Sequence, residues 1–260
     1  MSAVLGFLHR AFVVLALPVV LFVLWYVTSS SSTSFYFPPL RTILSKFHEY
    51  WLGDGFTRDI VPSVLRLLLG YALSCVVGVA LGVVLGLSRR VRTAAEPVLE
   101  FLRAIPPPVL VPVLLLIAGF GSAMKVTVIV TGSVWPILLN TVEGVKGIDP
   151  VLDDTCATYG ITGWRRLTQF VVPAAMPQIV AGMRTGLSIG IILMVISEMF
   201  AATSGLGAAI ILFQRSFAIP DMWSGVLVLG LIGFGLAMLF RVFESAVLGW
   251  YEGLKGLERQ

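Results

Sequence analysis

The sequence predicts an all-α polytopic membrane protein, and two properties of the chain support this prediction. Of its 260 residues, 57% are hydrophobic and only 12% are charged, which is about half the charged fraction of a soluble domain. The apolar runs approach the length of about twenty residues that a membrane helix needs, and they do not alternate as membrane β-strands do. The remaining loops leave no room for a soluble catalytic domain, so we expect one membrane domain over residues 1–260.

Six apolar runs are predicted as transmembrane helices. They cover residues 11–27, 60–87, 105–120, 126–142, 179–202 and 223–248. A secretory signal peptide is the competing interpretation of the first run, but the run is longer than a usual signal core and no A-x-A cleavage site follows it. We therefore expect a first, peripheral helix at residues 11–28 beside a core of residues 60–250.

The first half of the chain contains two further patterns. Apolar residues at helical spacing between residues 40 and 51 predict a short amphipathic helix at the membrane surface. In the run 60–87, small residues at every fourth position predict close packing against another helix. These residues are Gly70, Ser74, Gly78, Gly82 and Gly86. Arg66 lies near the start of the same run, and we expect its side chain to snorkel to the surface.

The run 105–120 is short for a bilayer and begins with Pro106, Pro107 and Pro108. It must start earlier, near Glu96, or be shielded by neighbouring helices. Pro136 is expected to kink the following span. Residues 204–221 are predicted as an outer loop.

The positive charges predict that both termini are cytoplasmic. With six spans, the inner segments hold Arg10, Arg89, Arg90, Arg92, Arg103, Lys146, Arg165, Arg166, Lys255 and Arg259. The outer segments hold Arg41, Lys46, Arg58, Lys125 and Arg215. Because cytoplasmic loops carry the excess of Lys and Arg, this distribution favours inner termini.

Residues 148–178 form the longest polar interruption in the second half of the chain. Asp149 and Pro150 predict a helix start, because Asp caps free backbone N–H groups and Pro is tolerated at the first helical position. Gly160 predicts the helix end, since Gly readily adopts the left-handed conformation. A second short helix is expected to end before Pro173. The pattern predicts a helix–Gly turn–helix hairpin between two spans.

This hairpin resembles the cytoplasmic coupling loop of importer-type ABC permeases, whose pattern is E-A-A-x3-G-x9-I-x-L-P. Here the pattern reads Asp154-Thr155-Cys156, three residues, Gly160, nine residues and Phe170-Val171-Val172-Pro173. Gly, Pro and the first acidic charge are kept, whereas both alanines, Ile and Leu are replaced. The resemblance places the coupling loop at residues 144–176. On these residues alone, an ordinary amphipathic hairpin at the membrane surface stays open as an alternative.

Further marks between residues 102 and 210 resemble the nitrate/sulfonate/taurine branch of ABC importer permeases. In order, they are Arg103-Ala104-Ile105-Pro106, Pro112, Gly119-Phe120-Gly121, Pro136-Ile137-Leu138-Leu139-Asn140-Thr141, Gly160, Pro173-Ala174-Ala175-Met176-Pro177, Gly182-Met183-Arg184, Ser197-Glu198-Met199 and Gly205-Leu206-Gly207. The resemblance implies the type I ABC importer permease fold and a multi-pass location in a prokaryotic cell membrane.

The resemblance also implies a division of labour between subunits. The chain would pair with a second copy, contact lipid, sit on two separate ATP-binding-cassette ATPase subunits and receive its solute from an external substrate-binding protein. ATP and Mg would be bound by the ATPase, so this chain is expected to hold no cofactor. The implied solute is a small anion such as sulfonate, taurine or nitrate, or alternatively a vitamin or a pyrimidine or thiamine precursor. The net charge of +4 is not read as a nucleic-acid signal.

For the coupling loop, we expect Asp153 and Asp154 to make polar contacts with the ATPase. Tyr159, Ile161 and Trp164 are expected to supply apolar docking area, as aromatic anchors do at interfaces. Thr155, Gly160 and Pro173 complete the predicted coupling set. Arg165 and Arg166 fit lipid phosphates or the partner equally well.

The transport path is predicted from polar residues inside spans. Glu198 is the only carboxylate deep in an apolar span, so its burial needs a partner or a wet cavity. Three interpretations stay open: a gate or cavity residue, a structural ion pair, for example with Arg215, or a glutamate near the outer water layer. Other candidates for the cavity wall are Asn140, Thr131, Ser133, Thr141, Ser188 and Met194. For each of them, helix packing or a hydrogen bond to the backbone is the competing interpretation.

Two other classes of protein, an intramembrane enzyme and a self-sufficient secondary carrier, fit the sequence poorly. No Gly-x4-Gly-Lys-Ser/Thr phosphate loop, G-x-S-x-G elbow or H-E-x-x-H helix is present, and we expect no catalytic residue and no metal ligand. Cys75 and Cys156 lie too far apart in this layout to pair. A self-sufficient secondary carrier usually shows inverted repeats and paired broken helices, which this sequence does not display.

Overall fold

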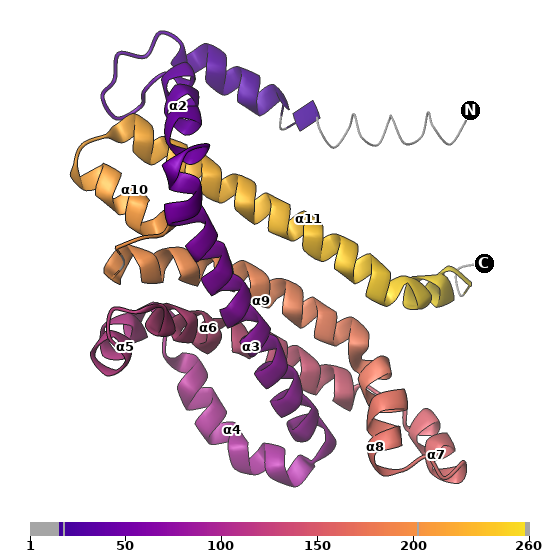
Figure 1. The fold of residues 1–260 in the computed structure, drawn as a ribbon. Helices are drawn as coiled ribbons and strands as arrows, with labels where there is room; N and C mark the ends of the chain where they lie inside the picture. Colours follow the sequence, from indigo (N-terminus) through magenta and orange to yellow (C-terminus); the bar gives the residue numbers. More distant parts are fainter. Residues whose placement is uncertain (1–15, 18, 202, 258–260) are drawn as a thin grey trace, which may run out of the picture.

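The computed structural model describes residues 16–17, 19–201 and 203–257, and these residues form helices and no β-strand. The prediction of an all-α protein is therefore confirmed. The helices in chain order are an unlabelled helix Val19–Ser29, α2 (Leu40–Lys46), η1 (Phe47–Trp51), η2 (Phe56–Ile60), α3 (Val61–Leu87), α4 (Arg89–Ala104), η3 (Pro107–Leu110), α5 (Val111–Ala118), α6 (Ser122–Lys146), α7 (Pro150–Thr158), α8 (Gly163–Arg166), η4 (Leu167–Val171), α9 (Val172–Ala201), α10 (Leu206–Arg215) and α11 (Ile219–Leu257) (Figure 1).

Helix α6 is the centre of the packing, and both α3 and α9 lie against it. A Cβ atom added at Gly70, Gly78 or Gly82 of α3 would approach Ile129, Ile137 or Thr141 of α6 to within 3.0 Å. The predicted stripe of small residues is thus confirmed as the contact face for α6. Close approach lets the two helices gain dispersion contacts along their length.

Within the described residues, four helices are long and apolar enough to cross a membrane. They are Phe56–Leu87, Ser122–Lys146, Gly163–Phe200 and Ile219–Tyr251. Part of the first predicted span, residues 11–15 and 18, lies outside the described residues, and the helix that follows, Val19–Ser29, belongs to the shorter apolar helices. The count rises to five if α4 and the segment Pro107–Ala118 are taken as one bent span.

Residues 107–118 of the predicted run 105–120 are helical, but the alternative in which this helix starts earlier, near Glu96, without a break is wrong. Helix α4 and the segment Pro107–Ala118 meet at an angle of 80°. Ile105 and Pro106, which separate them, have extended backbone with ψ of 116° and 124°. Each of these residues precedes a proline, and the proline ring disfavours the helical conformation of the residue before it.

Residues 204–221 were predicted as a loop, and this prediction is also wrong in part. They contain α10, whose residues from Leu206 to Ile210 are buried. The amphipathic helix predicted over residues 40–51 is confirmed as α2 and η1, and it packs against α11. There the Trp51 indole Nε1 donates a hydrogen bond of 2.8 Å to Ser224 Oγ.

The two ends of the domain differ in character. Figure 1 shows α7 and α8 together at one end of the long helices, with α2 and α10 at the other. We call these the hairpin end and the opposite end, and "the hairpin" means residues 149–172.

Candidate functional site

The hairpin begins and ends as its sequence dictates. Asp149 caps α7, because its Oδ1 accepts a hydrogen bond of 2.8 Å from the backbone N–H of Val151. Gly160 ends the helix at φ 68°, where the backbone N–H of Ile161 donates to Cys156 O at 2.9 Å and that of Gly160 donates to Ala157 O at 3.0 Å. This pair of bonds is a Schellman motif, which satisfies the carbonyls left free at a helix end.

The second helix of the hairpin does not end before Pro173, contrary to the prediction. Residues Gly163–Phe200 form one continuous helix of 38 residues. A π-turn, η4, ends at Val171, two residues before Pro173. This wider turn accommodates Pro173, which lacks the N–H that a regular turn would use. The hairpin is therefore a direct extension of the helix that crosses the membrane.

The hairpin exposes a group of large apolar side chains. Tyr159 and Trp164 are 79% and 76% exposed, and Val151 and Leu152 are 69% and 52% exposed. Ile161 and Pro173 are half-buried, while Thr155 is exposed and its hydroxyl bonds to Val151 O. Exposed aromatic side chains gathered on a short, capped element are typical of a protein-binding surface.

The two predicted acidic contacts differ in their surroundings. Asp153 Oδ1 accepts hydrogen bonds from Arg166 Nη2 at 2.5 Å and Nε at 2.9 Å, so this carboxylate joins the two helices of the hairpin. Asp154 is exposed, and its carboxylate has no hydrogen bond or ion pair within the described part of the chain. Asp154 is consequently the acidic group that is open to a partner.

The base of the hairpin is anchored in the membrane domain. Val171, Ala175 and Ile179 are buried together with Val83 of α3 and Val145 of α6. A Cβ added at Gly144 of α6 would lie 2.8 Å from Gln178 Cβ, which shows how closely α6 and the start of α9 approach. A force on the hairpin is therefore transmitted into the packed helices.

At the opposite end, Glu198 lies in a buried polar cluster. Its Oε1 is 2.8 Å from Arg66 Nη1, with the two side chains 0% and 11% exposed. Ser63 Oγ lies 2.8 Å from both carboxylate oxygens, and the backbone N–H of Gly207 donates to Oε2 at 3.1 Å. The ion-pair interpretation of Glu198 therefore holds, but its partner is Arg66 and not Arg215. Arg66 does not snorkel, since it is only 9% exposed.

The same cluster caps the buried start of α10. Asp59 Oδ1 accepts from the N–H of Gly205 at 2.8 Å, and Ser63 Oγ accepts from that of Leu206 at 2.8 Å. Burial, with the hydrogen bond that its hydroxyl donates to Asp59, raises the pKa of Tyr50 to about 12, so Tyr50 remains a donor at neutral pH. Together with the bond to Glu198, these contacts satisfy three N–H groups that a helix start leaves free.

This cluster was not predicted as a unit from the sequence. Asp59, Ser63 and Arg66 lie four and three residues apart, which places them on one face of a helix. That spacing, combined with the buried carboxylate of Glu198, was the available signal. The chemistry of the cluster is structural, because its polar groups are matched to one another.

The other predicted path residues lie along α6 and α9. Thr131 and Asn140 are half-buried, and their side chains bond to carbonyls of their own helix at Val128 and Pro136. Ser133 and Met194 are fully buried. Among the described residues, Ser133 Oγ is a buried polar atom without a hydrogen-bond partner.

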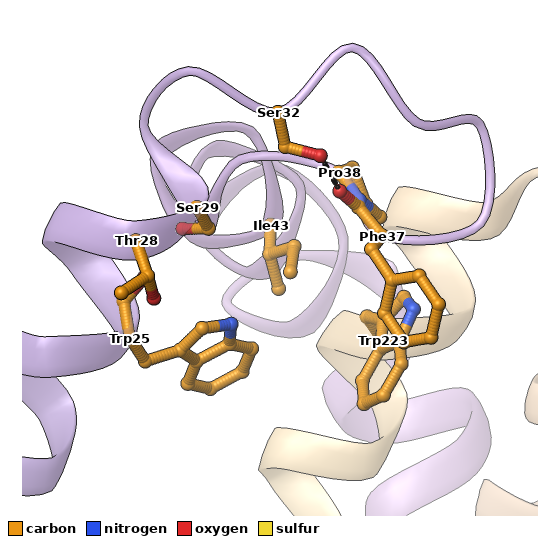
Figure 2. A pocket seen from close by; sticks show the side chains of 8 residues that line it. All are labelled: Trp25, Thr28, Ser29, Ser32, Phe37, Pro38, Ile43 and Trp223. Atoms are coloured by element: carbon orange, nitrogen blue, oxygen red, sulfur yellow. Dashed lines mark hydrogen bonds between the residues drawn. The ribbon is translucent and has the colours of Figure 1, made fainter.

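An aromatic cavity of about 370 Å³ lies at the opposite end, and Figure 2 shows its lining from the N-terminal segment, α2 and α11. The residues are Trp25, Thr28, Ser29, Ser32, Phe37, Pro38, Ile43 and Trp223. The ring of Trp223 lies 6.3 Å from that of Trp25 and 6.2 Å from that of Phe37. Tryptophan is enriched where the bilayer meets water, and two of the lining residues, Trp25 and Trp223, are of this type.

Comparison with known proteins supplies the family. A sequence model of the inner membrane component of binding-protein-dependent transport systems matches residues 78–248. The chain belongs to this family. It is thus a multi-pass permease component of the cytoplasmic membrane, and the match includes α6, the hairpin and α9.

Individual relatives are permeases of ABC transporters. The chain is 32% identical over 206 residues to a Methanocaldococcus jannaschii protein named for the ABC transporter permease class, covering 78% of this chain and 77% of that protein. It is 27% identical to the taurine transport permease TauC of Escherichia coli, covering 90% and 88%. It is 27% identical to the nitrate import permease NrtB of Synechocystis, covering 88% and 86%.

The fold is shared with a solved importer. A chain of the MetNI methionine ABC transporter, from a structure of its inward-facing conformations, superposes with a TM-score of 0.64 at 16% identity, covering 74% of this chain and 95% of that chain. The type I importer permease fold predicted for this chain is thereby confirmed. Within its described residues, the permease holds no group of three or more His, Cys, Asp or Glu side chains placed to bind a metal ion.

Proposed function

We propose that this permease works as a pair of identical copies, each seated on an ATP-binding-cassette ATPase subunit that hydrolyses ATP on its behalf. The observation that carries this proposal is the hairpin: a capped helix with exposed Tyr159 and Trp164 that continues without a break into α9. A binding surface built on the end of a membrane helix suits the transfer of movement from a soluble partner. The hairpin end is cytoplasmic in this proposal, with the substrate-binding protein docking at the opposite end.

The geometry suggests how movement passes through the permease. When the ATPase subunits approach one another, each hairpin is displaced, and α9 moves with it as one rigid element. Because Ala175 and Ile179 are packed against α3 and α6, the displacement changes the arrangement of the helices rather than bending the loop. Rigid-body rearrangement of this kind switches a transporter between inward-open and outward-open states.

The proposed solute is a small anion. Relatives that align over most of their length are named for taurine and nitrate. Both solutes carry a negatively charged group with several oxygen atoms.

Co-purification with the ATPase tests the proposal. We compare the double variant Tyr159→Ala/Trp164→Ala with a matched control, Tyr36→Ala, which removes an aromatic ring that is 65% exposed at the opposite end. Two anchors contributing about 2 kcal/mol each would lower affinity for the ATPase by roughly 700-fold. The control should co-purify normally.

A second readout is ATP hydrolysis by the assembled complex in response to the binding protein. The double variant should uncouple hydrolysis from the binding protein. The control for this readout is Val76→Ala, which changes an exposed side chain on the spanning helix Phe56–Leu87, away from both ends, and should leave the coupling unchanged. If the double variant assembled and coupled like the parent protein, the hairpin would not be the ATPase-binding element and the proposal would fail.

A further inference from the structure

A cavity of about 460 Å³ lies in the groove between α9 and α11 and contains two arginines. Arg184 and Ser188 line it from α9, one turn apart, and Arg241 lines it from α11. On the α11 side, Gly233 and Ala237 leave space in the groove, because their side chains are absent or small. We call this the arginine groove.

The arginine groove lies at the depth of the membrane. Tyr71 stands halfway along the spanning helix Phe56–Leu87, and its hydroxyl donates a hydrogen bond of 2.9 Å to Met183 O. Arg184 is therefore near mid-depth. Phe240 packs in one cluster with Val180 and Leu187, so Arg241 lies at a similar level.

The charged groups of the groove are open at this depth. The Arg184 side chain is 59% exposed while ion-paired with Glu244, whose side chain is 19% exposed. Arg241 is exposed and makes no hydrogen bond or ion pair to any described residue. Exposed guanidinium groups at mid-membrane do not face lipid, because the hydrocarbon cannot solvate their charge. They face water or another protein.

The charges in the groove favour an anion. Two guanidinium groups and one carboxylate leave one net positive charge. A guanidinium presents its N–H donors as a planar fork that matches the oxygens of carboxylates, sulfonates and related oxyanions. The exposed Ser188 hydroxyl, whose long bond of 3.4 Å to Arg184 O is readily exchanged for another acceptor, lies beside them, and the volume falls in the range of small-molecule sites.

We propose that the arginine groove is a transit site for a small oxyanion in the translocation path, with Arg241 as its main contact and Arg184 shared between the anion and Glu244. This inference rests on the proposed function, because it assigns the solute class to part of the same path. Glu244 competes with the anion for Arg184, so the site holds the anion weakly, as a site that must release its cargo requires.

Cysteine labelling of the complete importer tests the groove. Cys75 and Cys156 are first replaced by Ala, and Ser188→Cys is introduced. The thiol is treated with an anionic sulfonatoethyl or a cationic trimethylammonioethyl methanethiosulfonate, with and without ATP. The ratio of the two rates is normalised to that of Ser34→Cys, an exposed loop position. Val76→Cys, exposed by 69% on an apolar stretch of α3, is the lipid-facing control.

If the proposal is correct, Ser188→Cys reacts at least about tenfold faster than Val76→Cys in one of the nucleotide states. The normalised ratio favours the anionic reagent by about fivefold, and Arg241→Gln abolishes this preference while Arg241→Lys retains it. Ethanesulfonate slows the reaction, and ethylene glycol at the same concentration does not.

Two results would overturn the proposal that the arginine groove is a transit site. One is labelling no faster than Val76→Cys in either nucleotide state, which means that a second copy seals the groove. The other is an anion preference that Arg241→Gln leaves unchanged. ATPase co-purification, measured on the parent protein, separates the two proposals. A coupled complex whose groove is unreactive refutes the transit site alone. An anion-selective groove in a chain that binds no ATPase refutes the proposed function alone.

Discussion

Arg66 Nη1 lies 2.8 Å from Glu198 Oε1, in an ion pair that joins helices whose residues are 132 positions apart in the chain. Arg66 belongs to the start of α3 and Glu198 to the last turns of α9. The N–H groups at the start of α10 bond to the same cluster. One buried pair therefore holds three helices together at the end of the domain that lies away from the hairpin.

Removing Arg66 should be strongly destabilising. Arg66→Met leaves the Glu198 carboxylate buried without its cation, which costs about 3–5 kcal/mol of unfolding free energy. In Arg66→Met/Glu198→Gln part of this loss should be recovered, because no unpaired charge remains. Unfolding by titration with a denaturing detergent measures the unfolding free energy of both variants. The control is Lys46→Met, which breaks an exposed ion pair with Glu49 and should have little effect on unfolding, because water screens exposed charges. Equal losses for Arg66→Met and Lys46→Met would contradict the interpretation.

Gly205→Ala should disturb the same cluster through the backbone. Gly205 has φ 125°, and an added Cβ would lie 2.5 Å from the Glu198 carboxyl carbon. The variant must move the carboxylate away from Arg66, in addition to straining the backbone. Gly119→Ala is the matched control, since it has φ 70° and nothing within 4 Å of its added Cβ. We expect Gly205→Ala to lower the unfolding free energy by about 2 kcal/mol more than Gly119→Ala. A difference near zero would show that the cluster tolerates displacement.

Gly78→Leu should separate α3 from α6. A Cβ at this position would lie 2.9 Å from Ile137 Cβ, and a larger side chain leaves no room for the two helices at their present distance. We expect a loss of about 3 kcal/mol or more, in the upper range for overpacked cores. Gly230→Leu, on α11 with nothing within 4 Å of its added Cβ, controls for the change in helix propensity and should be close to neutral. The same unfolding titration compares the two, and similar losses would mean that α3 and α6 can move apart freely.

Substitutions at Gly160 test the hairpin, because the new side chain contacts no neighbouring atom. Its φ is 68° and an added Cβ meets nothing within 4 Å, so a substitution acts only through backbone conformation. Gly160→Val disfavours the left-handed conformation by about 1–2 kcal/mol, whereas Asn tolerates it. Binding of the ATPase should weaken by about tenfold in Gly160→Val and much less in Gly160→Asn, with unchanged unfolding of the membrane domain. Equal binding by both variants would show that the turn at Gly160 does not shape the ATPase contact.

Local patterns in the sequence were sufficient for several elements. The small-residue stripe from Gly70 to Gly86 predicted a helix contact, and Asp149 and Gly160 predicted both ends of α7. Each of these signals depends on residues close together in the chain, whose backbone preferences and side-chain spacing act locally. The continuation of α8 into α9 was not predicted, because Pro173 was read as a helix end although a π-turn accommodates it.

The order of residues by itself determined the helical membrane class and the family. It did so through the length of the apolar runs, the spacing of the charges and the Gly-Pro pattern of the hairpin. Tertiary structure alone decided that Glu198 pairs with Arg66, that α10 is buried, and that Arg184 and Arg241 share one groove. The physical reason is the cost of an unmatched charge or N–H group away from water. Which distant groups satisfy that requirement depends on the packing of whole helices, and no local run of residues specifies it.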